Sequence, residues 1–222
     1  MGKRRAPKPP EPDFTGGAIH ALSPHRGTTG DPETDRQVLE LVRDWHCTAG
    51  EELIAEMIIT ALKIGRDPIT VGDLKLINRA LKEVRAANRV FSPYRHRRKI
   101  VVYGSARTKP GRPDFDAAAE FARRMLREGY MTITGAGEGI MGAAQQGAGR
   151  DESFGLNINL PFEQNANATI EGDHKLIDFN YFFTRKLTFV KEADACALFP
   201  GGFGTMDECF RVGSPSCRRA RR

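Results

Sequence analysis

The sequence of 222 residues has little cysteine and no long apolar run. Its four cysteines, Cys47, Cys196, Cys209 and Cys217, form no C-x-x-C pair and have no histidine at zinc-finger spacing, which argues against a disulfide framework and a structural zinc site. No apolar stretch reaches the ~18 residues of a membrane span, and the N-terminal MGKRRAPKPP lacks the apolar region of a signal peptide. We therefore expect a protein of the reducing cytoplasm with no membrane partner.

The formal net charge of +6 comes from the two ends of the chain. When the nine cations at these ends are set aside, residues 9–210 carry a net charge of −3. A nucleic-acid-binding protein is expected to carry its basic patch on the folded part, so no nucleic-acid partner is predicted. The five histidines do not cluster, and we predict no metal site. The terminal cations are Lys3, Arg4, Arg5, Lys8, Arg211, Arg218, Arg219, Arg221 and Arg222.

Composition and periodicity divide the chain into four parts. Residues 1–30 are rich in proline and glycine without apolar periodicity, which predicts a disordered lead. Residues 31–92 carry three amphipathic stripes at helical spacing, and Asp31 followed by Pro32 is typical of a helix start, so a helical extension is expected there. Residues 93–212 are assigned to a Rossmann-like nucleotide-binding domain and residues 213–222 to an irregular basic tail.

Within residues 93–212, short β-branched runs alternate with helical stretches. This alternation predicts an α/β fold, namely a Rossmann-like doubly wound parallel sheet with helices on both faces. The first helix of this part is expected to take Asp114 as its cap. The expected strands are KIVVYGS from residue 99, YMTIT at 130–134, FGLNINL at 154–160, the run HKLIDF, and ACALF at 195–199.

Three of these strands end in glycine-rich turns, at residues 104–107, 135–139 and 201–205. Right-handed crossovers place all of these turns along one edge of a parallel sheet. Glycine lets the backbone approach a ligand closely, and free N–H groups favour a phosphate there. The GAGEG turn alone fits a purely structural turn equally well. It also lacks the G-x-G-x-x-G spacing and the downstream acidic residue of dinucleotide binders, so NAD is disfavoured.

The stretch PGGFGTMDE, residues 200–208, is more specific because three glycines, a threonine and a glutamate stand at fixed offsets. Together with the turn at 135–142 and the pair Arg185-Lys186, it resembles the LOG family, whose members are cytokinin riboside 5′-monophosphate phosphoribohydrolases often labelled lysine decarboxylase. The resemblance covers residues 99–210. The helical extension and LPFEQNAN at 160–167 make the chain similar to the longer bacterial branch, which includes nucleoside-5′-monophosphate nucleosidases.

This resemblance implies hydrolysis of the N-glycosidic bond of a nucleoside 5′-monophosphate, which gives a free base and ribose 5-phosphate. It implies a nucleoside monophosphate as the substrate, no cofactor, and a homodimer or higher homo-oligomer. The preferred base, and whether the substrate is a cytokinin or a common nucleotide, are left open by the sequence.

The resemblance also implies roles for individual residues. Arg185 and Glu208 match the catalytic pair, and Lys186 matches a neighbour that contacts substrate. For Arg107, the sequence leaves open whether the side chain contacts the ligand or only belongs to the loop. For Asn165 and Asn167, it leaves open whether they line the base pocket or stabilise the loop. Arg185 and Glu208 also fit a solvated helix residue and a favourable charge in a first helical turn. The expected substrate-binding residues are Gly104, Ser105, Gly137, Glu138, Gly139, Lys186, Gly201, Gly202, Gly204 and Thr205.

The sequence departs from the family pattern after Glu208. Gly213-Ser214-Pro215 stops a helix within two turns, and no further strand pattern follows. We therefore expect that the C-terminal end of the fold is missing, through truncation or a shifted reading frame, and that activity is in doubt. The alternatives are a nucleotide-binding or sensor module without turnover and a molybdenum-cofactor carrier.

Overall fold

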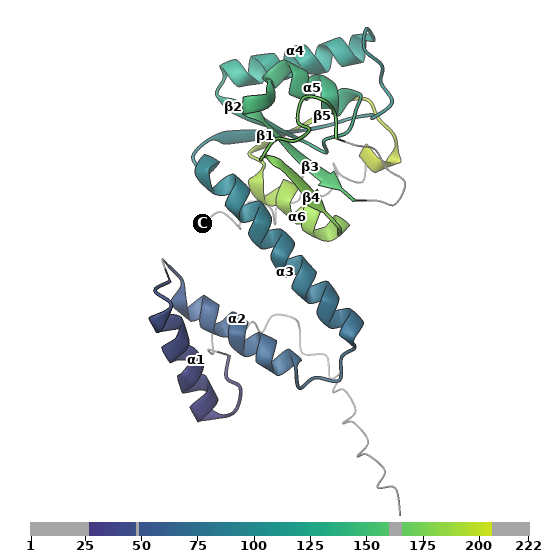
Figure 1. Ribbon diagram of the computed structural model, residues 1–222. Helices are drawn as coiled ribbons and strands as arrows, with labels where there is room; N and C mark the ends of the chain where they lie inside the picture. Colours follow the sequence, from purple (N-terminus) through teal and green to yellow (C-terminus); the bar gives the residue numbers. More distant parts are fainter. Residues whose placement is uncertain (1–26, 48, 160–165, 206–222) are drawn as a thin grey trace, which may run out of the picture. The chain divides into compact units, whose positions relative to one another are not determined.

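The computed structural model describes residues 27–47, 49–159 and 166–205 (Figure 1). These residues form two compact units that divide between Lys75 and Leu76. Most of the predicted disordered lead, the candidate catalytic residue Glu208 and the predicted basic tail lie outside the described residues.

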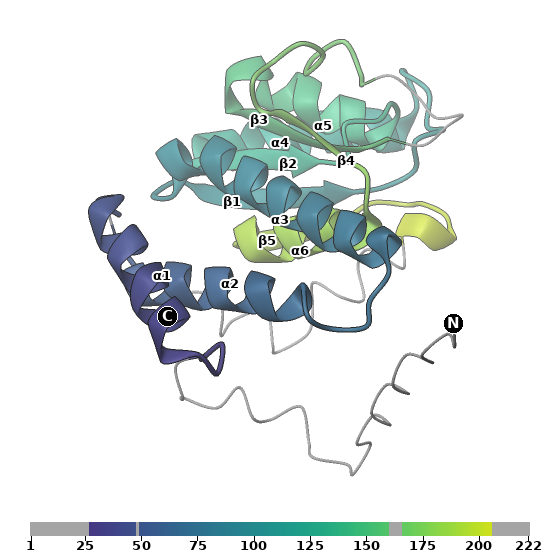
Figure 2. The same cartoon turned by 60° about the horizontal axis from the view of Figure 1, so that its bottom comes forward.

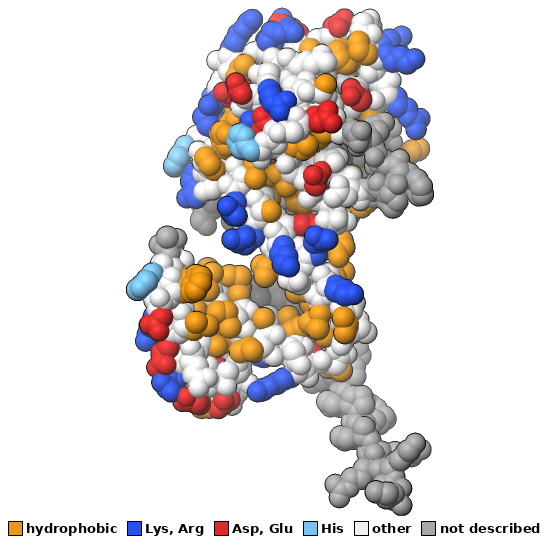
Figure 3. All heavy atoms as spheres, viewed as in Figure 1, with side chains coloured by type: hydrophobic (Ala, Val, Ile, Leu, Met, Phe, Trp, Pro, Cys, Tyr) orange, Lys and Arg blue, Asp and Glu red, His pale blue; other side chains and the backbone are white. Residues whose placement is uncertain are grey.

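The first unit is built from helices α1 (Pro32–Asp44) and α2 (Glu51–Ile64). Helix α1 begins as predicted, because the Asp31 carboxylate accepts a hydrogen bond from the Thr34 N–H at 3.2 Å and Pro32 opens the first turn. The buried side chains of this unit are few and small, and apolar side chains gather on its surface over α1 and α2 in Figure 3. The buried set is Val38, Val42, Ala55 and Ile59.

Helix α3 (Val71–Phe91) continues into the second unit and is followed by a short 3-10 helix, η1 (Ser92–Tyr94). The division between the units therefore falls inside α3, whereas the sequence places it after residue 92. The reason is that the second half of α3 packs on the sheet. Phe91 is 2% exposed, and its ring stacks on that of Phe154 with 4.4 Å between centroids.

The second unit contains a five-stranded parallel sheet in the order β4-β3-β2-β1-β5, which confirms the predicted Rossmann-like doubly wound fold. Both faces of its central strands are covered, as the near-continuous apolar run of β1 predicts. The strands are β1 (Arg98–Tyr103), β2 (Tyr130–Thr134), β3 (Ser153–Ile158), β4 (Leu176–Phe179) and β5 (Ala195–Leu198).

Helices cover the two faces in pairs (Figure 2). Helices α4 (Pro113–Arg127) and α5 (Ile140–Ala148) pack on one face, and η2 (Arg150–Glu152) links α5 to β3. Helix α3 and helix α6 (Phe182–Glu192) pack on the other face. The predicted cap of α4 is wrong, because Arg112 stands at the N-cap without a side-chain hydrogen bond and Asp114 lies inside the first turn. Pro113 opens that helix instead.

The strand order locates the functional edge of the sheet. From β1 the chain winds outward through β2, β3 and β4, and then returns to the other side of β1 with β5. In open α/β sheets, ligands bind outside the carboxyl ends of the strands where the winding direction changes. That position lies between the ends of β1 and β5.

Candidate functional site

The three glycine-rich turns meet through the backbone of one residue, Ser105, which follows β1. The Ser105 N–H donates to the Pro200 carbonyl at 3.0 Å, and the Ser105 carbonyl accepts the Ile140 N–H at 3.0 Å. The ends of β1 and β5 and the start of α5 are thereby joined at the point where the sheet changes winding direction. The structure thus brings together three predicted segments that are spread over about 95 residues of sequence, as the crossover rule predicts.

Close packing explains some of the glycines in these turns. A Cβ on Gly104 would lie 2.5 Å from the Ile140 side chain, and one on Gly139 would lie 2.3 Å from the Ser105 carbonyl oxygen. Gly139 also has φ of +67°, a conformation that glycine adopts without strain. A Cβ on Gly201 would lie 2.3 Å from Thr205 Oγ1. At these positions the fold itself requires glycine.

Gly202 and Gly204 differ from the other glycines of the site. A Cβ on either would meet no atom of the described residues within 4 Å, and neither has the positive φ that favours glycine. Both residues are exposed, while Thr205, the last residue described, is 9% exposed. Neither packing within the described residues nor backbone conformation accounts for glycine at these two positions. What glycine does provide at both is a backbone open to close approach.

The turn after β2 is held by buried polar side chains. Ala136 adopts φ of +66°, which is uncommon for a residue with a side chain, and its N–H donates to Thr134 Oγ1 at 3.0 Å. The Asn167 Nδ2 amide donates to the Ala136 carbonyl at 2.8 Å and lies 2.9 Å from the Gly137 carbonyl. These contacts fix a conformation that the local sequence would not favour by itself.

Asn167 and Gln145 form the buried centre of this support. Asn167 is 3% exposed, its Nδ2 also lies 2.6 Å from Gln145 Oε1, and Gln145 Nε2 donates to the Phe154 carbonyl at 3.1 Å. The chain therefore uses Asn167 for loop structure, one of the two roles left open by the sequence. The predicted counterpart Asn165 lies outside the described residues. Sequence reasoning missed Gln145, which looks like an ordinary helical residue.

Arg185 lies against this turn and is 7% exposed, so it is not a solvated helix residue. Its Nε donates to the Leu156 carbonyl at 2.7 Å, and its guanidinium lies 5.2 Å from the centroid of the Phe189 ring. A Cβ on Gly135 would stand 2.5 Å from Arg185 Nη2. The absence of a side chain at Gly135 thus admits the arginine to the end of β2.

Lys186, the next residue, faces a different part of the surface. It lines a hollow of about 330 Å³ on α6 together with apolar residues, of which Phe182, Phe183 and Leu187 are about half exposed. Successive helical residues point about 100° apart, and in this structure Arg185 and Lys186 have different surroundings. Glu138 is exposed in the β2–α5 turn, and its carboxylate lies near Gly142 in the first turn of α5.

A buried carboxylate that the sequence did not single out anchors the start of α6. Glu83 on α3 accepts hydrogen bonds from the Asn180 N–H at 3.0 Å, from Asn180 Nδ2 at 2.9 Å and from Thr184 Oγ1 at 2.6 Å. The N-cap residue Tyr181 supplies no side-chain hydrogen bond, and Glu83 on α3 instead holds the residues on either side of it, Asn180 and Thr184. Burial alone would raise the pKa of Glu83, but the hydrogen bonds from Thr184 and Asn180 outweigh it and hold the pKa below its usual value.

Two further observations bear on the kind of site. Within the part of the chain that the structure describes, no group of three or more histidine, cysteine, aspartate or glutamate side chains is placed to hold a metal ion. Among the same residues, no helix combines the length and the apolar character needed to cross a membrane.

Comparison with known proteins supports the family resemblance. Residues 141–216 match the model of a family described as possible lysine decarboxylase, the label that the LOG family often carries. The predicted family resemblance is thus confirmed over these residues, which include the turn at 201–205 and Glu208. No curated protein matches the chain.

The chain is also similar to solved structures. One, of the structural-genomics target TM1055, shares 24% identity over 52% of this chain and 68% of its own, with a TM-score of 0.41. Another is the molybdenum cofactor binding protein of the phototrophic bacterium Rippkaea orientalis. It shares 23% identity over 51% of this chain and 68% of its own, with a TM-score of 0.40. The Moco carrier protein of Chlamydomonas reinhardtii shares 18% identity over 55% of this chain and 81% of its own, with a TM-score of 0.40.

Proposed function

We propose that this protein hydrolyses the N-glycosidic bond of nucleoside 5′-monophosphates and releases a free base and ribose 5-phosphate. The observation that carries the proposal is the meeting of three glycine-rich turns at the winding switch of the sheet, with Gly202 and Gly204 uncrowded among the described residues. A nucleotide is the class of ligand that this position in an open α/β sheet favours.

The turn at 201–205 is the proposed phosphate site. Backbone N–H groups at the start of a helix lack partners within the helix, and glycine lets an anion reach them without steric hindrance. Gly202 and Gly204 offer that approach, and the buried Thr205 adds a hydroxyl at the same turn. A nucleoside without the phosphate leaves these groups unused, so it is expected to react more slowly.

Arg185 and Glu208 are the proposed catalytic residues. In the reaction, water adds to C1′ of the ribose while the C1′–N bond breaks, and the electron pair stays on the base nitrogen, which takes up a proton. Positive charge develops on the sugar in the transition state, and a carboxylate such as that of Glu208 stabilises it or orients the water. A cation at Arg185 assists the departing base, and its contact with the β2–α5 turn supports a place beside the site.

Binding without turnover is the second candidate, and it includes carriage of the molybdenum cofactor. The observation in its favour is that Arg185 is buried and already donates to the Leu156 carbonyl, which also fits a purely structural arginine. Two solved structures similar to the chain are named for molybdenum-cofactor binding or carriage.

Release of free adenine from AMP, followed by HPLC with adenosine as the comparison substrate, tests the proposal. We expect turnover of AMP in preference to adenosine and a fall in kcat of roughly 100-fold or more in Arg185→Lys, because the shorter cation loses its place beside the leaving base. Arg124→Lys, an exposed change on α4, is the matched control. Equal rates on AMP and adenosine, or tight AMP binding with no adenine released, would contradict the hydrolase proposal.

We also propose that the protein is a homodimer or higher homo-oligomer. The support is the apolar surface of α6, where Phe182, Phe183 and Leu187 are 48%, 52% and 51% exposed. Contiguous apolar patches on a protein surface often mark sites of contact with another protein. Light scattering coupled to gel filtration gives the mass directly, and a monomer at micromolar concentration would contradict this part.

A further inference from the structure

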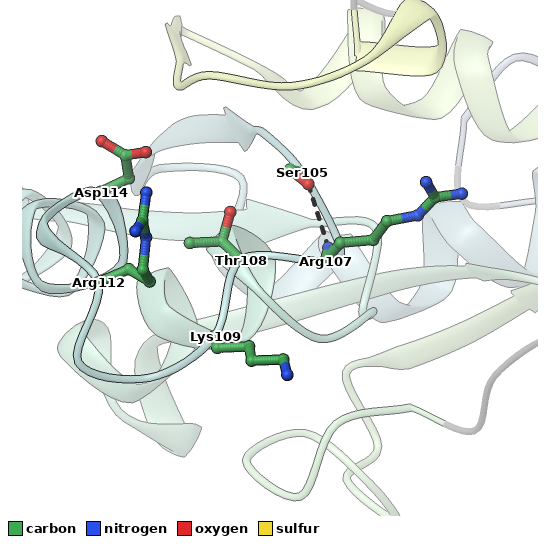
Figure 4. Close-up of a pocket in the computed structure, with 6 residues that line it drawn as sticks. All are labelled: Ser105, Arg107, Thr108, Lys109, Arg112 and Asp114. Atoms are coloured by element: carbon green, nitrogen blue, oxygen red, sulfur yellow. Dashed lines mark hydrogen bonds between the residues drawn. The ribbon is translucent and has the colours of Figure 1, made fainter.

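The loop between β1 and α4 surrounds a second hollow, of about 340 Å³, beside the candidate phosphate turn. Figure 4 shows the side chains that line it. Arg112 and Asp114 stand at one end, Arg107 extends from the other, and the hydroxyl groups of Ser105 and Thr108 lie between them. Lys109 completes the lining.

The charges of this hollow are unbalanced. Its lining residues include three cations and one carboxylate, which leaves a net charge of +2. Arg107, Lys109 and Arg112 are all exposed, and none of them forms an ion pair with any residue that the structure describes. On helix α4, which follows the loop, Arg123 and Arg124 by contrast both form ion pairs with Glu120. The loop therefore holds positive charge that the described protein does not neutralise.

The loop has a defined backbone shape despite its exposure. The Arg107 N–H donates to Ser105 Oγ at 3.1 Å, the Arg112 N–H donates to the Lys109 carbonyl at 3.3 Å, and Gly111 turns the chain with φ of +81°. These contacts keep the cations on one loop beside Ser105. Ser105 belongs both to this hollow and to the backbone contact with Pro200, so one ligand is able to span both places.

We propose that this hollow is a second anion subsite, which binds an additional phosphate of the nucleotide whose 5′-phosphate sits at the turn 201–205. The proposal rests on the proposed function and extends its ligand class to nucleotides that carry a second phosphate. A terminal phosphate monoester carries about −1.5 to −2 at neutral pH, which matches the net charge of the hollow. Guanidinium groups suit phosphate because they donate two parallel hydrogen bonds.

Calorimetric binding at low ionic strength tests this subsite without relying on turnover. The ligands are AMP, ADP and adenosine 3′,5′-bisphosphate. The wild-type protein is expected to bind at least one of the two-phosphate ligands roughly 10-fold more tightly than AMP, with the gain shrinking as salt is added. Lys109→Ala combined with Arg112→Ala is expected to reduce the gain to within about 2-fold while AMP affinity stays the same. Lys82→Ala with Arg127→Ala removes the same charges from exposed positions outside the hollow and is expected to keep the gain.

The outcomes separate this subsite from the catalytic proposal. Tighter binding of ADP alone would show that the subsite takes a phosphate attached to the 5′-phosphate. Tighter binding of the bisphosphate alone would show that it takes a phosphate on the ribose, and either result supports the subsite. Equal affinity for all three ligands, or an equal loss in both double variants, would overturn it. If AMP is hydrolysed without such a gain, the subsite fails and the hydrolase stands. If the two-phosphate ligands bind more tightly but AMP is not hydrolysed, the subsite stands and the hydrolase proposal fails.

Discussion

The turn after β2 and the loop after β1 meet at the same edge of the sheet, where the Ile140 N–H binds the Ser105 carbonyl, yet different groups shape them. The β2–α5 turn is held from inside by the Asn167 amide, which reaches two of its carbonyls. The β1–α4 loop carries exposed cations at Lys109 and Arg112 that have no ion pair among the described residues.

The two regions therefore differ in what they determine: one fixes a backbone conformation, and the other supplies surface charge. A buried amide with several partners specifies one backbone conformation, because any other would leave polar groups unsatisfied. Exposed cations specify little of the fold, and they leave charge available to a ligand. The β2–α5 turn therefore sets where Arg185 stands, and the β1–α4 loop carries the charge of the proposed anion subsite. Changes in the two regions should affect different measurements.

The largest effect is expected for Gly135→Ala. The new methyl group would stand 2.5 Å from Arg185 Nη2 and 2.9 Å from the Met141 sulfur, so the arginine must move. We expect AMP turnover to fall about 100-fold, as misplacement of a catalytic group by about 1 Å can cause. Overpacking should lower the free energy of unfolding by about 1–3 kcal/mol.

Gly202→Ala is the matched comparison, because its Cβ meets no described atom within 4 Å. The free energy of unfolding is expected to change by less than about 0.5 kcal/mol, while KM for AMP rises because the methyl group blocks the backbone. Normal AMP turnover in Gly135→Ala would show that Arg185 is not placed by this turn.

Asn167→Ala tests the buried support itself. The change leaves carbonyl groups of the turn and Gln145 Oε1 without their donor, which should lower the free energy of unfolding by about 2–3 kcal/mol. Chemical denaturation measures the change. Asn157→Ala, which removes a more exposed hydrogen bond to Asp178, should cost less than about 1 kcal/mol. Equal losses in the two variants would mean that burial of Asn167 adds nothing.

The smallest effect is expected for Glu83→Gln, and it appears in the pH dependence of stability. The pKa of Glu83 lies below its model-peptide value of 4.5 in the folded protein, so its contribution is fully present above pH 4.5 and is lost as the pH falls through the lowered value. The glutamine variant should lack this part of the acid-side decline. Melting temperatures between pH 3 and 7, compared with those of the exposed variant Glu40→Gln, measure it. Parallel curves for wild type and Glu83→Gln would contradict a role for the charged form of Glu83 in holding the start of α6.

Local signals made much of the second unit predictable. The strand YMTIT was predicted with the same bounds that the structure shows for β2, and the alternation of strands and helices was enough to predict a parallel sheet. Motif residues such as Gly139 and Gly201 were predicted to come together, because the crossover rule depends only on chain order. The cap of α4 was wrong, because Pro113 takes the first helical position, which leaves Arg112 at the N-cap and Asp114 inside the first turn.

The sequence by itself determined the alternation of elements, the edge at which the glycine-rich turns gather, and the family resemblance. These follow from periodicity, chain order and short-range spacing. Only the tertiary structure decided that Glu83 anchors the start of α6, that Asn167 and Gln145 hold the β2–α5 turn, and that Arg185 is buried against Gly135. Each of these contacts joins residues between about 20 and 100 positions apart. Their pairing depends on how helices and strands pack, and no local propensity encodes it.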